Sequence, residues 1–176
     1  MTYSSQIMTT ALTGTPGVGK TTVAEHLRKE GYKVLDLNAF IGEKGLRGER
    51  DELRQSDEVD ISDLRGHITK TSEYDIIEGH LSHHLKLSPI IVLRCSPKEL
   101  RNRMASKDWP QRKIEENIQA EILDVILIES LEYTDEVYEI DTTEIDSEEV
   151  SKAVIEIMNN NFENYSVGQV DFSDEF

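Results

Sequence analysis

Residues 14–21 read GTPGVGKT and fit the pattern G-x-x-x-x-G-K-[ST] at every fixed position. The β-forming stretch Ile7–Thr13 precedes them, and helically spaced Val23, Ala24 and Leu27 follow. Between a strand and a helix, such a loop surrounds phosphate with backbone N–H groups, its lysine bridges the outer phosphates and its hydroxyl holds Mg²⁺. We predict that ATP with Mg²⁺ binds here, at Gly17, Val18, Gly19, Lys20, Thr21 and Thr22, and that Thr21 is a metal ligand.

Strand and helix patterns alternate along the rest of the chain. Apolar runs such as IIVL, with little polar alternation, are typical of parallel strands covered on both faces. The pattern predicts an α/β fold with a central parallel sheet and right-handed crossovers. We expect further strands over 33–37, 74–77, 90–94 and 137–140, and helices over 20–30, 97–106, 110–131 and, capped by Ser147, 147–158.

Length and composition favour one globular domain. The 176 residues are 37% hydrophobic, and the single cysteine, Cys95, excludes a disulfide framework and a cysteine-rich zinc site. No apolar run approaches a membrane span and no signal peptide opens the chain, so we expect a cytoplasmic protein without a membrane partner. We expect the domain to cover residues 1–162, followed by an acidic, flexible tail over 163–176, in which Tyr165, Phe172 and Phe176 are able to dock.

The charge distribution is uneven. A formal net charge of −16 argues against general or sequence-specific binding of nucleic acid. The window from Arg94 to Lys113 nevertheless holds seven lysines and arginines against two acids. It is either a small polyanion site or a solvated helix face. In the first case Lys107, Arg112 and Lys113 are placed to close over a triphosphate and stabilise a phosphoryl group in transfer.

The segment YDIIEGH (74–80) offers a second group of candidates. Glu78 ends an apolar strand, where it is placed to order the water shell of Mg²⁺, and the alternative is a solvated loop carboxylate. His80 is able to position water or phosphate, or to pack as an ordinary histidine. A zinc site of His80, His83 and His84 is a further alternative, which needs converging geometry that spacing alone does not show.

Residues 38–60 are polar, charged and apparently irregular, with three glycines. Their cations, Lys44, Arg47 and Arg50, suit a second phosphate-bearing substrate, whereas the simpler interpretation is a solvated loop.

These motifs together resemble a known family. The loop GTPGVGKTT, the run Glu78-Gly79-His80, the strand end VLRCSP and the run RKIEENIQAEI occur in the order seen in the P-loop family named “Putative adenylate kinase”, and this chain looks like an archaeal-type member. Its eukaryotic members are adenylate kinase isoenzyme six, also called coilin-interacting nuclear ATPase. The resemblance covers about residues 7–158. Two positions depart from the family pattern, because Glu78 replaces a common Asp and Lys107 a common Arg.

The resemblance implies a nucleoside monophosphate kinase fold with a five-stranded parallel sheet, an AMP-binding insert at 37–60 and a lid at 106–116. It implies phosphoryl transfer from ATP to AMP, with a slower ATPase, and an ATP contact at Lys107. The residues that we expect to act in transfer are Lys20, Glu78, His80, Lys107 and Arg112, with Mg²⁺ held by Thr21 and Glu78.

The family is also associated with small ribosomal subunit assembly and rRNA maturation. There it binds the eleventh small-subunit ribosomal protein family and the pre-ribosomal small subunit. Two alternatives therefore stay open beside the adenylate kinase: an assembly factor switched by ATP with little kinase activity, and a P-loop kinase of another small acceptor.

Overall fold

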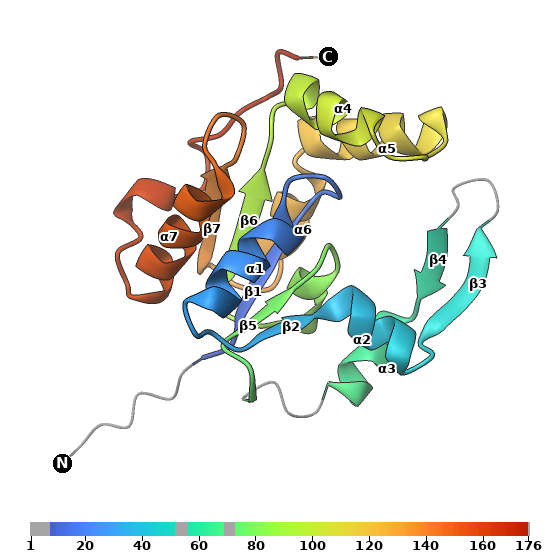
Figure 1. Cartoon of the computed structure of the whole chain (residues 1–176), viewed down its shortest axis with the longest axis horizontal. Coiled ribbons are helices and arrows are strands. Elements are labelled where there is room, and N and C mark those ends of the chain that lie inside the picture. Colours follow the sequence, from blue (N-terminus) through green and yellow to red (C-terminus); the bar gives the residue numbers. More distant parts are fainter. Residues whose placement is uncertain (1–7, 52–55, 69–72, 176) are drawn as a thin grey trace.

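The structure, a computed structural model, describes residues 8–51, 56–68 and 73–175. Its centre is a parallel sheet in the order β2-β5-β1-β6-β7 (Figure 1). The strands are β1 (Thr10–Gly14), β2 (Val34–Asp36), β5 (Ile76–Glu78), β6 (Ile90–Arg94) and β7 (Val137–Asp141). The predicted α/β fold with a five-stranded parallel sheet is confirmed. The expected strand start at Ile7 lies outside the described residues.

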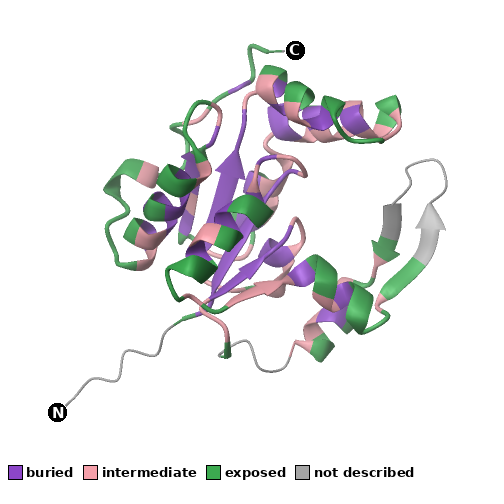
Figure 2. Ribbon diagram, viewed as in Figure 1, coloured by how far each residue is buried: buried purple, intermediate pink, exposed green. Residues whose placement is uncertain are grey.

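Both faces of the sheet are covered, which explains the unbroken apolar runs. On β6, Ile91 and Leu93 join a cluster with α1 (Lys20–Lys29) and α7 (Ser147–Met158). Their neighbours Ile90 and Val92 point to the opposite face and pack with Leu127 of α6 (Val125–Leu131). This alternation follows from the two-residue period of a strand. Figure 2 shows the central strands β1, β5 and β6 buried, the edge strand β2 half-buried, and the flanking helices with both buried and exposed residues.

The described parts of the segment that we expected to be irregular, residues 38–51 and 56–60, contain regular secondary structure. They form α2 (Leu37–Glu43) and the antiparallel pair β3 (Arg47–Asp51) and β4 (Ser56–Val59), and α3 (Ile61–His67) returns the chain. Asp36 caps α2 and Asp60 caps α3 through their side chains. Leu37, expected to end a strand, begins α2 because Asp36 caps it there.

The expected single helix over 110–131 is two helices. α4 (Pro97–Ala105) begins as predicted, with Ser96 accepting from the Glu99 N–H at 3.3 Å. α5 (Gln111–Ile122) then ends before α6, because Asp124 adopts a left-handed conformation with φ of 54°. The cap of α7 also differs from the prediction. Asp146 accepts from two N–H groups of the first turn, and Ser147 is the first helical residue.

The C-terminal segment, expected to be loose, contacts β7 at individual residues and is otherwise mostly exposed over residues 163–175. Ser166 forms an antiparallel bridge with Tyr138, and the Gly168 N–H donates to Glu139 at 2.7 Å. Phe172 is 7% exposed. Phe176, the third aromatic residue named for docking, lies outside the described residues. No helix in the described part of the chain is long and apolar enough to cross a bilayer.

Candidate active site

The phosphate loop leaves β1 and enters α1 directly. Gly14 lies so close to β6 that a Cβ there would come within 2.4 Å of the Leu93 carbonyl oxygen. Gly19 begins α1 at a φ of 108°, in the left-handed region that favours glycine. Gly14, at a φ of 140°, needs glycine for both space and backbone conformation, whereas Gly19 needs it for conformation alone. Together the two glycines fix the path of the loop whose backbone N–H groups lead into the first turn of α1.

Lys20 lies at the base of this loop. Its Nζ donates to the carbonyl oxygens of Gly14 at 2.6 Å and Thr15 at 3.0 Å. Burial lowers the pKa of the ammonium to about 8, while the carboxylates of Glu78 and Glu121 oppose that change. The lysine is therefore a buried cation held by backbone carbonyls and flanked by two acids, a set of acceptors that phosphate oxygens can replace.

Glu78 ends β5 beside the loop and is 2% exposed. Burial and the neighbouring Asp36 raise the pKa of its carboxyl group, and Lys20 opposes this shift. Both Glu78 and Thr21 line the same cleft. A carboxylate and a hydroxyl are hard oxygen donors of the kind that Mg²⁺ prefers, so the residues present fit this ion.

A cleft of about 920 Å³ opens in front of the loop. One wall carries Asn38 and Ile41 of α2 with Arg47 of the hairpin, and the other carries residues of α4, α5 and their connection. Of the three cations expected in the insert, Arg47 lines the cleft and Lys44 lies over the Phe40 ring. The Arg50 side chain is outside the described residues.

The basic window is divided between structural and cleft-lining roles. Lys107 and Lys113 line the cleft, with their Nζ atoms 5.1 Å and 4.6 Å from the Trp109 ring centroid. Arg112 does not line it, contrary to our expectation. The Arg112 side chain is 60% exposed and pairs with Glu116 at 2.9 Å.

His80 lies in the cleft, as expected, but as a neutral group. Burial lowers the pKa of its imidazole to about 4, and the cation of Lys20 adds to this shift. At pH 7 it can therefore donate or accept a hydrogen bond but carries no charge. The alternative of a site formed by His80, His83 and His84 does not match the grouping among the described residues, where His83 and His84 lie with Glu129 rather than with His80.

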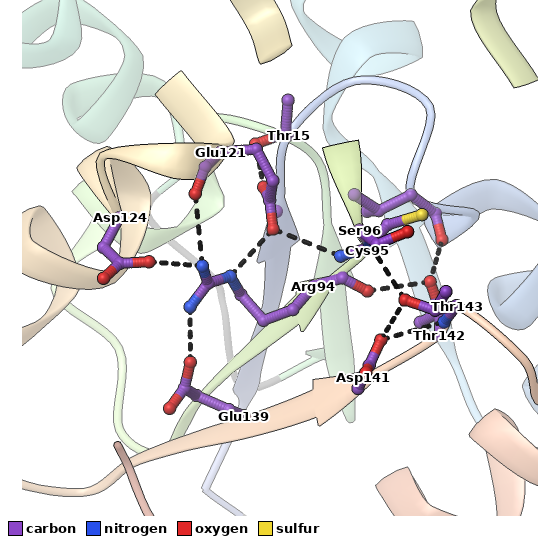
Figure 3. A network of polar contacts seen from close by, with 12 residues as sticks. Thr15, Arg94, Cys95, Ser96, Glu121, Asp124, Glu139, Asp141, Thr142 and Thr143 are labelled. Carbon is purple, nitrogen blue, oxygen red and sulfur yellow. Dashed lines mark hydrogen bonds and ion pairs between the residues drawn. The ribbon is translucent and has the colours of Figure 1, made fainter. Parts of the chain in front are cut away.

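Arg94 organises a buried polar network behind the loop (Figure 3). It donates to Glu121 at 2.8 Å and to Glu139 at 2.5 Å, and it also pairs with Asp124. Burial opposes its charge, yet these carboxylates hold the pKa of Arg94 above its ordinary value. This residue of the basic window is thus bound by acids and is not a substrate contact.

Glu121 carries this network into the phosphate loop. Its carboxylate accepts from the Thr15 hydroxyl at 2.5 Å, the Arg94 Nε at 2.8 Å and the Cys95 N–H at 3.1 Å (Figure 3). The side chain is 3% exposed. It therefore joins α5 to the loop and to β6 through one buried group.

A second cavity of about 270 Å³ lies on the other side of the loop. Arg103 lines both cavities and donates to the Val18 carbonyl at 3.3 Å and the Thr142 carbonyl at 2.7 Å. Arg103, Glu121 and Glu129 were missed as site residues by the sequence analysis. The only signal for Arg103 was its place in the basic window, Glu121 stands in the run RKIEENIQAEI that carries the family resemblance, and Glu129 stands in no motif that we identified.

Comparison with known proteins identifies the family. The model of the family described as AAA domain matches residues 11–124. “Putative adenylate kinase” of Archaeoglobus fulgidus is 43% identical over 171 residues, which are 96% of this chain and 93% of that protein. The protein of the same name from Methanocaldococcus jannaschii is 40% identical over 96% of this chain and 95% of its own length.

Among solved structures, shikimate kinase from Acinetobacter baumannii in complex with shikimate has a TM-score of 0.60 and 17% identity. The match covers 88% of this chain and 94% of that one. Shikimate kinase from Bacteroides thetaiotaomicron gives a TM-score of 0.56, also at 17% identity. At this identity the likeness concerns the P-loop kinase fold alone. The chain thus belongs to the AAA domain family and, within it, to the archaeal proteins named “Putative adenylate kinase”.

Proposed function

We propose that this protein is an adenylate kinase that transfers the terminal phosphoryl group of Mg²⁺-ATP to AMP. The observation that carries the proposal is the cleft of about 920 Å³, which has the Lys20 loop at its base and cations on two facing walls. This volume is at the upper end of the range for ligand pockets, about 300–1,000 Å³. The curated relatives carry the same activity in their name.

The chain contributes positioning and charge rather than a covalent intermediate. Lys20 is the cation nearest the loop amides, and Lys107 and Lys113 are the cations of the wall formed by residues 106–116. We assign ATP to the loop, with its base toward the second cavity. The acceptor nucleotide belongs on the side of Asn38 and Arg47.

The metal assignment follows from the donors. Thr21 and Glu78 would hold Mg²⁺, whose chemistry is to neutralise charge on the outer phosphates. Burial raises the pKa of Glu78, and a nearby cation would oppose this shift by favouring the ionised carboxylate. We propose that His80, which is neutral, forms a hydrogen bond at the edge of this site.

The test is a product balance. Purified protein is incubated with Mg²⁺-ATP, with and without AMP, and ADP, free phosphate and AMP are quantified. The proposal expects AMP to be consumed and ADP to rise without matching free phosphate. Slow release of phosphate at the same rate with or without AMP would contradict it. Small acceptors that carry a hydroxyl group are tested in place of AMP, and their phosphorylation would indicate a kinase of another substrate rather than an adenylate kinase.

The charge of the chain favours a second role beside the first. We propose that a slower ATPase cycle controls binding of a basic partner, in small ribosomal subunit assembly and rRNA maturation. A net charge of −16 favours such a partner, because opposite charge speeds association. The probe is a protein of the eleventh small-subunit ribosomal family, captured at moderate salt with and without ATP. Binding that is absent, or unaffected by ATP, would refute the switch.

A further inference from the structure

Two consecutive histidines and one glutamate converge at one end of the cleft. His83 and His84 belong to the 3-10 turn η2 (Ser82–Leu85), which packs against α6, and Glu129 comes from α6. The three ligand atoms all lie within 4.8 Å of one another. The two imidazole rings also lie together, with centroids 3.9 Å apart. All three residues line the cleft, so the cluster is accessible from it.

Each imidazole is held by its other nitrogen. The Nδ1 of His83 is 3.0 Å from the Thr13 hydroxyl, and the Nδ1 of His84 is 3.1 Å from the Tyr133 hydroxyl. Both rings therefore present Nε2 to the same Glu129 oxygen, at 2.9 Å for His83 and 3.8 Å for His84. Outer partners that fix ring orientation in this way accompany most histidines that bind metals.

The spacing suits a tetrahedral ion. Bonds of about 2.0–2.1 Å in tetrahedral geometry place ligand atoms roughly 3.3 Å apart. The two separations to the Glu129 oxygen, 2.9 Å and 3.8 Å, lie on either side of that distance. The remaining pair of ligand atoms lies within 4.8 Å, so side-chain movements of up to roughly 1.5 Å would satisfy the geometry. Three protein ligands would leave the fourth position open to the cleft.

Metal binding would replace the hydrogen bond between His83 Nε2 and Glu129, but the outer hydrogen bonds of both rings can be kept. A metal on Nε2 of His83 requires the tautomer with hydrogen on Nδ1, which then donates to the Thr13 oxygen. The Thr13 hydroxyl can donate in turn to the His80 carbonyl, 3.4 Å away. The same change at His84 makes Tyr133 the acceptor. Every polar group that changes its role keeps a partner.

The charges around the cluster make Glu129 the decisive ligand. Arg65 donates to the His84 carbonyl at 2.6 Å, and both Arg65 and Lys86 lie 5.8 Å from the Tyr133 ring. These cations oppose a bound metal, whereas the Glu129 carboxylate, 40% exposed, offsets them. Without it, two neutral imidazoles would face two cations.

We propose that His83, His84 and Glu129 form a site for one divalent cation of the zinc class, separate from the Mg²⁺ position at Thr21 and Glu78. Two nitrogen donors select a borderline ion such as Zn²⁺ or Co²⁺ over Mg²⁺, which prefers oxygen. The bound ion would join η2 to α6 and so fix one end of the cleft.

The experiment uses nucleotide-free protein in excess Mg²⁺, so its outcome does not depend on the proposed kinase activity. Zn²⁺ is titrated in competition with a chromophoric chelator, and Co²⁺ is added in a parallel experiment to record its visible spectrum. Wild type is expected to bind one equivalent and to give the intense bands of four-coordinate Co²⁺. His84→Ala and Glu129→Gln are expected to weaken Zn²⁺ binding at least tenfold, and Tyr133→Phe by about tenfold through loss of the outer partner.

The matched control is His67→Ala. His67 also lies against a carboxylate, at 3.3 Å from Asp63, but no third ligand is grouped with this pair among the described residues. Its loss is expected to leave Zn²⁺ binding unchanged. Thermal unfolding shows which variants are folded, and either His84→Ala or Glu129→Gln is sufficient for the test. Equal Zn²⁺ affinity in wild type and a folded ligand variant, or no stoichiometric binding by wild type, would overturn the proposal.

Discussion

Replacing Glu121 by alanine tests whether the buried network holds the phosphate loop in place. The carboxylate is 3% exposed and accepts hydrogen bonds from Thr15, Arg94 and Cys95. The variant leaves the Thr15 hydroxyl and the Cys95 N–H without this acceptor, and it removes one of the three carboxylates around Arg94. Breaking a buried ion pair by removing one partner costs about 3–5 kcal/mol. For a chain of this size that lowers the Tm by about 6–20 °C.

Two further variants separate the contributions. Glu121→Gln keeps an acceptor for Arg94 and Cys95, and its amide can donate to the Thr15 oxygen, so it loses the charge and the acceptor of the Thr15 hydroxyl hydrogen. Its expected cost is about 1–2 kcal/mol. Glu115→Ala removes a glutamate from the same helix, where it pairs with Arg101 at 2.8 Å on the surface. An exposed pair of this kind contributes less than about 1 kcal/mol.

Urea unfolding of wild type and the three variants, followed by circular dichroism, gives the free energies, and thermal unfolding gives the Tm values. The expected order of destabilisation is Glu121→Ala, then Glu121→Gln, then Glu115→Ala. If Glu121→Ala costs no more than Glu115→Ala, the network does not hold the loop and the reasoning is wrong.

Three other predictions concern the cleft. Lys20→Met should reduce ADP formation to background while Lys29→Met, an exposed change on the same helix, should not; equal activity in a coupled assay would remove Lys20 from the site. Lys107→Met should lower kcat more than it raises KM, because we assign the Lys107 Nζ, which lies over Trp109, to the transferring group. The reverse pattern in steady-state kinetics would make Lys107 a binding group only. Because burial lowers the pKa of His80 to about 4 from 6.5, the unfolded chain binds its proton first and the folded state loses stability as pH falls from about 6.5 toward 4. Urea midpoints at pH 7.5 and 5 should therefore differ less in His80→Gln than in wild type, and an unchanged difference would contradict this.

Features encoded by neighbouring residues were predictable from the sequence. The strand Ile90–Arg94 and the start of α4 at Pro97 lie where the pattern placed them, because sheet burial and helix capping leave local signals. The hairpin β3–β4 was missed because polar residues fill both strands. Without an apolar alternation, a strand cannot be distinguished from a loop.

Features that depend on distant partners were not predictable. The apolar stripe of α5 continues into α6, so periodicity alone indicates one helix. The break at Asp124 is accompanied by two contacts from Arg94, one to the Asp124 carboxylate and one to the Glu121 carbonyl at 3.2 Å. Both partners lie about thirty positions along the chain from this arginine, beyond the reach of any local pattern.

The candidate site divides in the same way. The loop around Lys20 is contiguous in sequence and was predicted, whereas Glu121 and Glu129 come from helices far along the chain. Charge counting also does not distinguish the cations of one window, since Arg94 and Arg112 belong to the same basic window as Lys107. The structure pairs both arginines with acids. Because acids of the protein already pair with these arginines, the number of cations in a basic window overstates the number available to a ligand.

The pairing of Arg94 with buried carboxylates also explains why the acidic C-terminal segment can pack beside them. Arg94 faces three carboxylates, and Phe172 covers its guanidinium at 5.5 Å from the ring centroid. The Gly168 N–H donates to the Glu139 oxygen that Arg94 does not occupy. Burial raises the pKa of Glu139, and this N–H together with Arg94 opposes the shift. The segment therefore completes the hydrogen bonding of a buried acid and shields the cation beside it, which couples the end of the chain to the network behind the phosphate loop.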